Sequence, residues 1–359
     1  MSILVSPQEL RESIYHGERF TLLATHWQPQ LRQSYNEFTS LHIPTALFSD
    51  TANSFAGLPG SQVGRNPLPD PDKLQEHFRQ WGIREDRPVV VYDEGRGLFA
   101  GRAWWTLRWA GLDNVRILDG GLANWRHLGY TTLTGPGNFA VGATAEVNPG
   151  QMPVATIDDV RNHDGLLIDT RTRNRFAGRR ENLDLKAGHI PGAVNVPERL
   201  FHNDGLRTWK SAGEIREVLF DAGLTPDNVQ GAIIYSGSGN HSALALAAMH
   251  DAGFTGLRHY VGGWSQWSKR LSSQMLSKQS PSLAKEQLDL TYKVKKSEYD
   301  EIMSLTNPAV KKKLLESFAD GADASAVHLK AAGLPRTANH VILPINSLKD
   351  SEVYAPNYR

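Results

Sequence analysis

An internal repeat constrains the fold of this chain more than any other feature. Six pairs of segments recur in the same order, at an offset between 142 and 150 residues: 22–25 with 167–170, 42–46 with 189–193, 89–92 with 232–235, 110–111 with 252–253, 120–121 with 262–263, and Trp125 with Trp267. The second pair reads His-Ile-Pro-Thr-Ala and His-Ile-Pro-Gly-Ala. A period of this length is far too long for a solenoid. The repeat therefore predicts two whole domains of similar fold.

Each copy alternates short apolar runs with helical patterns. The strand-like run, the helix and the next strand-like run lie, in order, at 88–92, 101–109 and 115–118 in the first copy, and at 232–235, 242–252 and 257–261 in the second. Strand, helix and strand at this spacing build right-handed βαβ units. The predicted fold class is therefore α/β, with two tandem domains that each contain a parallel sheet flanked by helices.

Composition sets the domain boundaries. All nine tryptophans precede residue 270, and the stretch 271–283 (LSSQMLSKQSPSL) is serine-rich and polar, which is typical of a linker. We predict a first domain at 1–135 and a second at 150–270, the latter carrying the functional loop at 236–241. The extension at 284–359 resembles no family that we recognise, and its fold and role stay open.

The chain of 359 residues contains no cysteine, which excludes disulfides, thiolate zinc sites, iron–sulfur ligation and any thiol nucleophile. A net charge of +1 argues against a broad nucleic-acid footprint or binding to an anionic membrane. The sequence has no apolar run of the ~18 residues that a membrane span needs, and its N-terminus lacks a signal-peptide pattern. We therefore expect a cytoplasmic protein with no metal, cofactor, nucleic-acid or membrane partner; the oligomeric state stays open.

The loop after the second-copy strand at 232–235 is the strongest candidate site. It reads Ser236, Gly237, Ser238, Gly239, Asn240 and His241. Ligands of parallel α/β folds bind at the carboxyl ends of strands, where the next helix begins. The glycines let successive backbone N–H groups point inward, and the start of the helix adds partial positive charge. The loop therefore predicts a cradle for an anion carried by the residue at 236, although an ordinary glycine-rich turn explains this stretch equally well.

Beyond the repeat itself, the body of the chain, from about residue 5 to 270, resembles the two-domain rhodanese-like sulfurtransferases, which include thiosulfate and 3-mercaptopyruvate sulfurtransferases. The resemblance is carried by the paired segments at 42–46 and 189–193, and by 102–105, 118–122 with Trp125, 169–171, 175–178 and 262–267. In that family the second-domain loop begins with a cysteine, which takes a sulfane sulfur from a donor as a persulfide. The cysteine then passes the sulfur to cyanide or a thiol. The Gly237–Ser238 pair resembles the loop of the mercaptopyruvate class.

Ser236 stands where the family has its nucleophile. A hydroxyl cannot form a persulfide, so we expect this chain to be inactive in sulfur transfer. A deliberate replacement and a natural non-catalytic module that binds an anion or a partner both remain possible explanations. A serine hydrolase is disfavoured because the G-x-S-x-G elbow is absent and no acid partner for His241 is evident.

The resemblance also implies substrate-binding residues. Arg175 matches the family arginine that pairs with the donor's carboxylate or sulfonate oxygens, a task for which a guanidinium fork is suited. We expect Gly237, Ser238, Gly239, Asn240 and His241 to complete the donor site. A second family arginine falls at Asn182, so Arg179, Arg180 or Lys186 could substitute for it. The Asp and His that the mercaptopyruvate group takes from its first domain fall at Ala52 and Asn66, so their proton relay is expected to be missing.

Other matched positions favour structural roles. Asp93 occupies the first-copy position equivalent to Ser236, so the first copy is expected to be catalytically silent. His189 and its repeat partner His42 are expected to fix loops through hydrogen bonds. Tryptophans 104, 105, 109 and 125 are expected to lie in the core.

Overall fold

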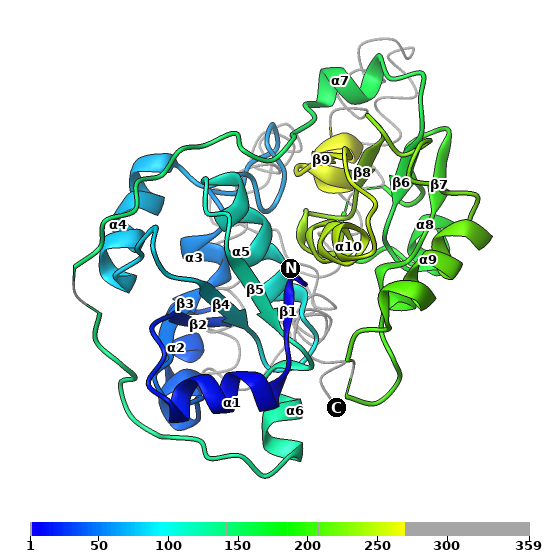
Figure 1. Cartoon of the computed structure of the whole chain (residues 1–359). Helices are drawn as coiled ribbons and strands as arrows, with labels where there is room; N and C mark the ends of the chain where they lie inside the picture. Colours follow the sequence, from blue (N-terminus) through cyan, green and yellow to red (C-terminus); the bar gives the residue numbers. More distant parts are fainter. Residues whose placement is uncertain (1, 141, 185, 207, 270–359) are drawn as a thin grey trace, which may run out of the picture. The chain divides into compact units, whose positions relative to one another are not determined.

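A computed structural model describes residues 2–140, 142–184, 186–206 and 208–269 (Figure 1). The predicted linker at 271–283 and the extension at 284–359 lie outside the described residues. Residues up to 181, together with 186–267, form one unit, and this unit is described by itself. Among the described residues, no helix has the length and apolar character needed to cross a bilayer.

The first copy contains a five-stranded sheet of order β1-β5-β4-β2-β3, in which every pairing is parallel. Its elements are β1 (Leu4–Val5), α1 (Pro7–Tyr15), β2 (Thr21–His26), α2 (Leu31–Ser40), β3 (Leu47–Asp50), α3 (Thr51–Ser54), α4 (Pro71–Trp81), β4 (Val89–Tyr92), α5 (Leu98–Trp109), β5 (Val115–Leu118) and α6 (Gly121–His127).

The second copy contains a four-stranded parallel sheet of order β7-β6-β8-β9. Its elements are α7 (Ile157–Arg161), β6 (Leu167–Asp169), α8 (Arg173–Phe176), β7 (Ala193–Asn195), the 3-10 helix η1 (Glu198–Phe201), α9 (Ala212–Asp221), β8 (Ile233–Tyr235), α10 (Asn240–Asp251) and β9 (Arg258–Tyr260). The predicted fold class is confirmed: both copies are parallel sheets flanked by helices.

The central helices begin earlier than the sequence predicted. Helix α5 begins at Leu98 and α10 at Asn240, whereas the patterns placed these starts at 101 and 242. The reason is a glycine immediately before each helix: Gly97 (φ 71°) and Gly239 (φ 91°) adopt the left-handed conformation and turn the chain directly from the loop into the helix.

The repeated His-Ile-Pro segments perform the same structural task twice. The Ile43 N–H donates to the Tyr92 hydroxyl at 3.1 Å, and the Ile190 N–H donates to the Tyr235 hydroxyl at 3.0 Å. Each tyrosine ends the strand that precedes the functional loop or its equivalent. Burial raises the pKa of both phenols, so each remains a neutral hydroxyl. The motif therefore ties a loop to the central strand of each sheet.

The two copies share one apolar core across α5 and α10. A Cβ on Gly101 would lie 2.8 Å from the Leu244 Cα, so only a glycine lets these two helices approach so closely. The predicted core tryptophans are confirmed, because all four are at most 7% exposed: Trp104, Trp105, Trp109 and Trp125. This shared core brings first-copy residues next to the loop of the second copy.

Candidate active site

The loop from Ser236 to Gly239 joins the carboxyl end of β8 to the first residue of α10. Ser236 is fully buried, and its Oγ accepts the Gly239 N–H at 3.1 Å. The start of α10, a helix of 12 residues, faces this turn. The partial positive charge of a helix N-terminus therefore acts on the side chain at 236.

The two residues that follow the repeated Gly-Gly pair hold this loop through backbone hydrogen bonds. The Ser236 carbonyl accepts the Trp264 N–H at 2.8 Å, and the Gly237 carbonyl accepts the Ser265 N–H at 2.8 Å. A Cβ on Gly263 would lie 2.3 Å from the Ser236 carbonyl oxygen, so the close approach requires glycine. The loop backbone is therefore fixed at both carbonyls, which positions the side chain at 236.

The equivalent first-copy loop already holds an anion, the carboxylate of Asp93. That buried carboxylate accepts four backbone N–H groups, from Gly95 (2.9 Å), Gly97 (2.9 Å), Phe99 (2.9 Å) and Ala100 (3.3 Å). Ser236 places a neutral hydroxyl at the matching position. The first-copy turn therefore stabilises a negative charge at the residue that follows the strand.

Two guanidinium groups converge on the loop at Gly237. An ideal Cβ at Gly237 would lie 3.1 Å from Arg65 Nη2 and 3.2 Å from Arg175 Nη1. Arg175 comes from α8 and pairs with Glu181 at 2.8 Å, whereas Arg65 comes from the segment between α3 and α4 of the first copy. The Arg65 backbone N–H donates to Ser265 Oγ at 3.0 Å, which fixes that segment beside the loop.

A third guanidinium lies against Gly239. Arg102 of α5 is fully buried, and a Cβ on Gly239 would lie 2.7 Å from its Nη1. Its other donors reach the carbonyls of Phe55, Asn66 and Pro67, while Nη1 has no hydrogen-bond partner among the described residues. Burial lowers the pKa of Arg102 to about 10, so the group is still a cation at neutral pH.

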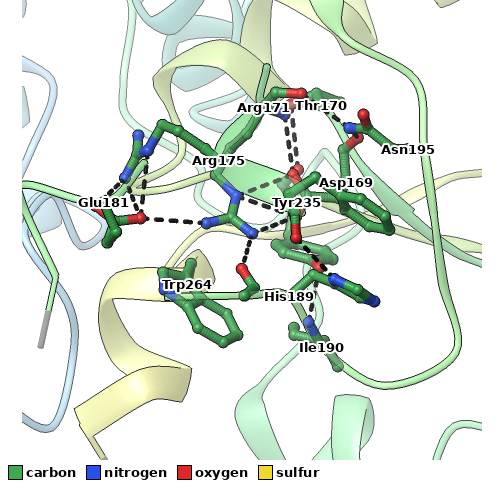
Figure 2. A network of polar contacts seen from close by, with 12 residues as sticks. Asp169, Thr170, Arg171, Arg175, Glu181, His189, Ile190, Asn195, Tyr235 and Trp264 are labelled. Atoms are coloured by element: carbon green, nitrogen blue, oxygen red, sulfur yellow. Dashed lines mark hydrogen bonds and ion pairs between the residues drawn. The ribbon is translucent and has the colours of Figure 1, made fainter. Parts of the chain in front are cut away.

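A buried ionic network lies beside the loop (Figure 2). Arg171 donates to both carboxylate oxygens of Asp169, with Nη2 at 2.6 Å from Oδ2, and its Nη1 lies 3.5 Å from Glu181. The guanidinium also lies over the Trp264 ring, 5.0 Å from the centroid. Glu181 thereby links Arg171 to Arg175 and fixes the orientation of the latter toward the loop.

Asn66, where the alignment places the family's first-domain His, contacts the loop in the structure. Asn66 Nδ2 donates to Ser238 Oγ at 2.9 Å. An amide has no titratable proton near neutral pH, so this pair holds Ser238 in place without relaying a proton.

His241 lies in the first turn of α10, with its side chain 38% exposed, and its Nδ1 lies 2.7 Å from Glu198 Oε1. The sequence showed no acid partner for His241; the structure supplies Glu198, 43 residues away in the chain. Asn240 beside it is buried.

Arg179 and Arg180, two of the candidates for a second donor arginine, are exposed. Arg65 is the second guanidinium at the loop.

His189 has the structural contacts that were predicted for it. Its Nδ1 lies 2.8 Å from the Phe176 carbonyl oxygen, and its ring stacks on Phe176 with centroids 3.8 Å apart. His42 repeats this arrangement with Phe38, at 2.9 Å and 4.4 Å.

Sequence reasoning missed four residues at this site. Arg65 adjoins Asn66, which the alignment had singled out, so its position was a usable signal. Arg102 belongs to a motif that carries the family resemblance, but the motif predicts no role for it at the site. Ser242 of α10 contacts the loop and His259 of β9 contacts Ser242; the two residues are 17 apart and no motif joins them.

Comparison with known proteins agrees with this architecture. The model of the rhodanese-like domain matches residues 31–128 and 155–270. A Mycobacterium tuberculosis protein named "Putative thiosulfate sulfurtransferase SseB" is 34% identical over 271 residues, which cover 74% of this chain and 94% of that protein. The 3-mercaptopyruvate sulfurtransferase of Escherichia coli K12 is 32% identical over 247 residues, 67% of this chain and 84% of the relative.

A solved structure shows the same fold. The crystal structure of SseA from Escherichia coli, described as that of a 3-mercaptopyruvate sulfotransferase, matches with a TM-score of 0.63 and 27% identity, and it covers 74% of this chain and 100% of that one. With two rhodanese-like domains and relatives that are sulfurtransferases of both donor classes, this chain belongs to the two-domain rhodanese-like sulfurtransferase family.

Proposed function

We propose that this chain is a sulfurtransferase scaffold with serine at the nucleophile position, inactive in sulfur transfer as it stands. The observation that carries the proposal is the contrast between the two copies: one loop surrounds the Asp93 carboxylate with four N–H donors, and its counterpart holds the neutral Ser236. A loop of this kind suits a side chain that becomes anionic, which a cysteine thiolate or persulfide does and a serine hydroxyl does not.

The chemistry that the site would support with a thiol at 236 is a two-step transfer. The thiolate attacks the outer sulfur of thiosulfate or the thiol sulfur of 3-mercaptopyruvate, and a new S–S bond forms. The donor's S–S or C–S bond breaks with its electron pair on sulfite or on the enolate of pyruvate, which then takes up a proton. An acceptor thiolate or cyanide then attacks the outer sulfur, and the thiolate at 236 leaves. In both steps, the N–H of Gly239, the start of α10 and Arg102 stabilise negative charge at position 236.

The proposed donor is a small anion, either thiosulfate or 3-mercaptopyruvate. Arg175 and Arg65 converge at Gly237 from the two copies, next to the position that would react. Guanidinium groups bind sulfonate and carboxylate oxygens through paired N–H donors. We assign Gly237, Ser238, Gly239, Asn240 and His241 to the wall of the donor site. A cytoplasmic location stays a prediction.

The experiment compares Ser236→Cys (S236C) with the unchanged chain and with Ser238→Cys (S238C), which places a thiol two residues along the same loop. We expect S236C, and neither of the others, to gain the mass of one sulfur atom after incubation with thiosulfate or 3-mercaptopyruvate. We also expect only S236C to produce thiocyanate from cyanide. If S236C melts at the temperature of the unchanged chain and gains no sulfur from either donor, the hypothesis of a sulfurtransferase scaffold is wrong.

The alternative is a non-catalytic module that binds an anion or a partner in the same place. The convergence of Arg65 and Arg175 supports it, because those cations suit an anion whether or not residue 236 reacts. Thiosulfate binding by the unchanged chain, combined with no sulfur uptake by S236C, would favour this alternative.

A further inference from the structure

A buried chain of hydrogen bonds leads away from the nucleophile position. Ser236 Oγ lies 3.1 Å from Ser242 Oγ, and Ser242 Oγ lies 2.7 Å from His259 Nε2. All three residues are fully buried. The Ser242 hydroxyl also donates to the Gly239 carbonyl at 3.2 Å. Burying polar groups is unfavourable unless their hydrogen bonds are satisfied, so an apolar pair at 242 and 259 would be the simpler solution for folding alone.

The first copy uses that apolar solution. Ala100 stands three residues after Gly97, as Ser242 stands three residues after Gly239. Ile117 pairs with Val91 in the first sheet, as His259 pairs with Ile234 in the second. The fold therefore accepts alanine and isoleucine at these places. The polar pair occurs in the copy whose loop does not contain its own carboxylate.

The ring of His259 is held neutral. Burial, and next the charge of Arg102, lower its pKa well below that of an ordinary histidine. The ring packs edge-on against Trp105, with centroids 4.5 Å apart, and its Nδ1 has no hydrogen-bond partner among the described residues. A neutral imidazole carries one N–H, and Nε2 is the ring nitrogen within hydrogen-bond distance of Ser242.

We propose that His259 Nε2–H donates to Ser242 Oγ, and that the Ser242 hydroxyl, which donates to the Gly239 carbonyl in the unchanged chain, donates instead to an anionic atom at 236. The pair would thereby hold a negative charge at that atom. Ser242 contacts the reacting atom directly, while His259 is a positioning residue that acts through Ser242. The proposal rests on the proposed function, since it assigns the pair to the nucleophile of that same site.

Three guanidinium groups lie around the loop: Arg102 from α5, Arg65 from the segment before α4, and Arg175 from α8, which pairs with Glu181. The His241–Glu198 pair lies at the start of α10. These groups are unchanged in every variant below. A change in thiol pKa among those variants therefore reports the pair at 242 and 259.

The test measures the thiol pKa in S236C by the pH dependence of iodoacetamide alkylation, which needs no sulfur donor. Ser242→Ala (S242A) and His259→Ile (H259I) introduce the first-copy residues into S236C. We expect either to raise the thiol pKa by about one unit, which slows alkylation about tenfold below that pKa, as loss of one hydrogen bond to a charged group implies. The double variant should lose no more than S242A, because both changes break the same chain.

His259→Gln (H259Q) separates donation from proton uptake. Glutamine retains an N–H donor but cannot accept a proton at neutral pH. We expect H259Q to keep the thiol pKa of S236C. If H259Q raises the pKa as much as H259I does, the donor assignment is wrong; if S242A and H259I leave the pKa unchanged in folded protein, the whole proposal is wrong.

The unchanged chain provides an independent measurement. Nitrogen-15 NMR of the histidine rings should show His259 neutral at pH 7 with its proton on Nε2, and a proton on Nδ1 would overturn the proposal. Should S236C form no persulfide while S242A still shifts the thiol pKa, the proposed function would fail and the assignment of this pair would stand.

Discussion

Asp93 and Ser236 follow equivalent strands of the two repeats, and each is enclosed by a turn that leads into a helix. The Asp93 carboxylate accepts four backbone N–H groups of its turn, whereas Ser236 Oγ accepts the N–H of Gly239 and contacts Ser242. The first-copy turn thus surrounds a negative charge that the chain itself supplies. The other places a neutral group where two guanidiniums approach.

The first prediction concerns Asp93. Asp93→Ala (D93A) removes the acceptor of four backbone N–H groups, two of them buried, so we expect the free energy of unfolding to fall by about 3 kcal/mol or more. Urea denaturation measures the change. Asp164→Asn, at an exposed position, is the control and should alter stability by less than about 0.5 kcal/mol. A D93A variant as stable as this control would show that the carboxylate does not organise the turn.

The Gly-Gly pair allows a matched test of steric fit. Gly263 (φ 54°) faces the Ser236 carbonyl at 2.3 Å from an ideal Cβ, while Gly231 (φ 74°) has open space around that position. Gly231→Ala should cost about 1 kcal/mol through backbone strain alone. Gly263→Ala should cost clearly more, because the carbonyl must also move. Equal losses in urea denaturation would contradict the close approach of 263 to the loop.

The proposed donor site predicts a role for the two guanidinium groups that lie at Gly237, those of Arg65 and Arg175. We expect Arg65→Met and Arg175→Met each to weaken thiosulfate binding to the unchanged chain about tenfold or more, because each removes charge-assisted hydrogen bonds. Isothermal titration calorimetry measures the affinity, and Arg179→Met, at an exposed position, is the control. If Arg65→Met binds as the unchanged chain does, Arg65 is not part of the anion site.

The pH dependence of stability should report His259. Its pKa lies well below that of the unfolded chain, so below about pH 6.5 the unfolded state binds the extra proton. Stability should therefore fall as the pH falls from 6.5 toward the folded pKa, by up to about 1.4 kcal/mol per pH unit from this group. H259Q should remove that contribution. Denaturation curves for both chains at pH 7 and pH 5 make the comparison, and identical slopes would contradict a neutral His259.

The architecture could be predicted from the amino-acid sequence, because the fold depends on local and repeated signals. Apolar runs at 89–92 and 232–235, glycines after the helices and the two His-Ile-Pro segments each recur, and each proved to have the same role in both copies. The loop after Tyr235 could also be located, since strand order and glycine content both pointed to it. The helix starts were missed by a few residues because Gly97 and Gly239 turn the chain at once.

The distant side chains that meet at that loop could not be predicted without the three-dimensional structure. Arg65 and Arg102 reach it from the first copy because α5 and α10 pack closely enough to share a core, and sequence spacing carries no record of that packing. Ser242 and His259 meet because β9 lies beside β8 in the sheet, at the end where α10 begins. The sequence gives the residue types at a site. The distances that let those residues act together arise from packing between elements that are far apart in the sequence.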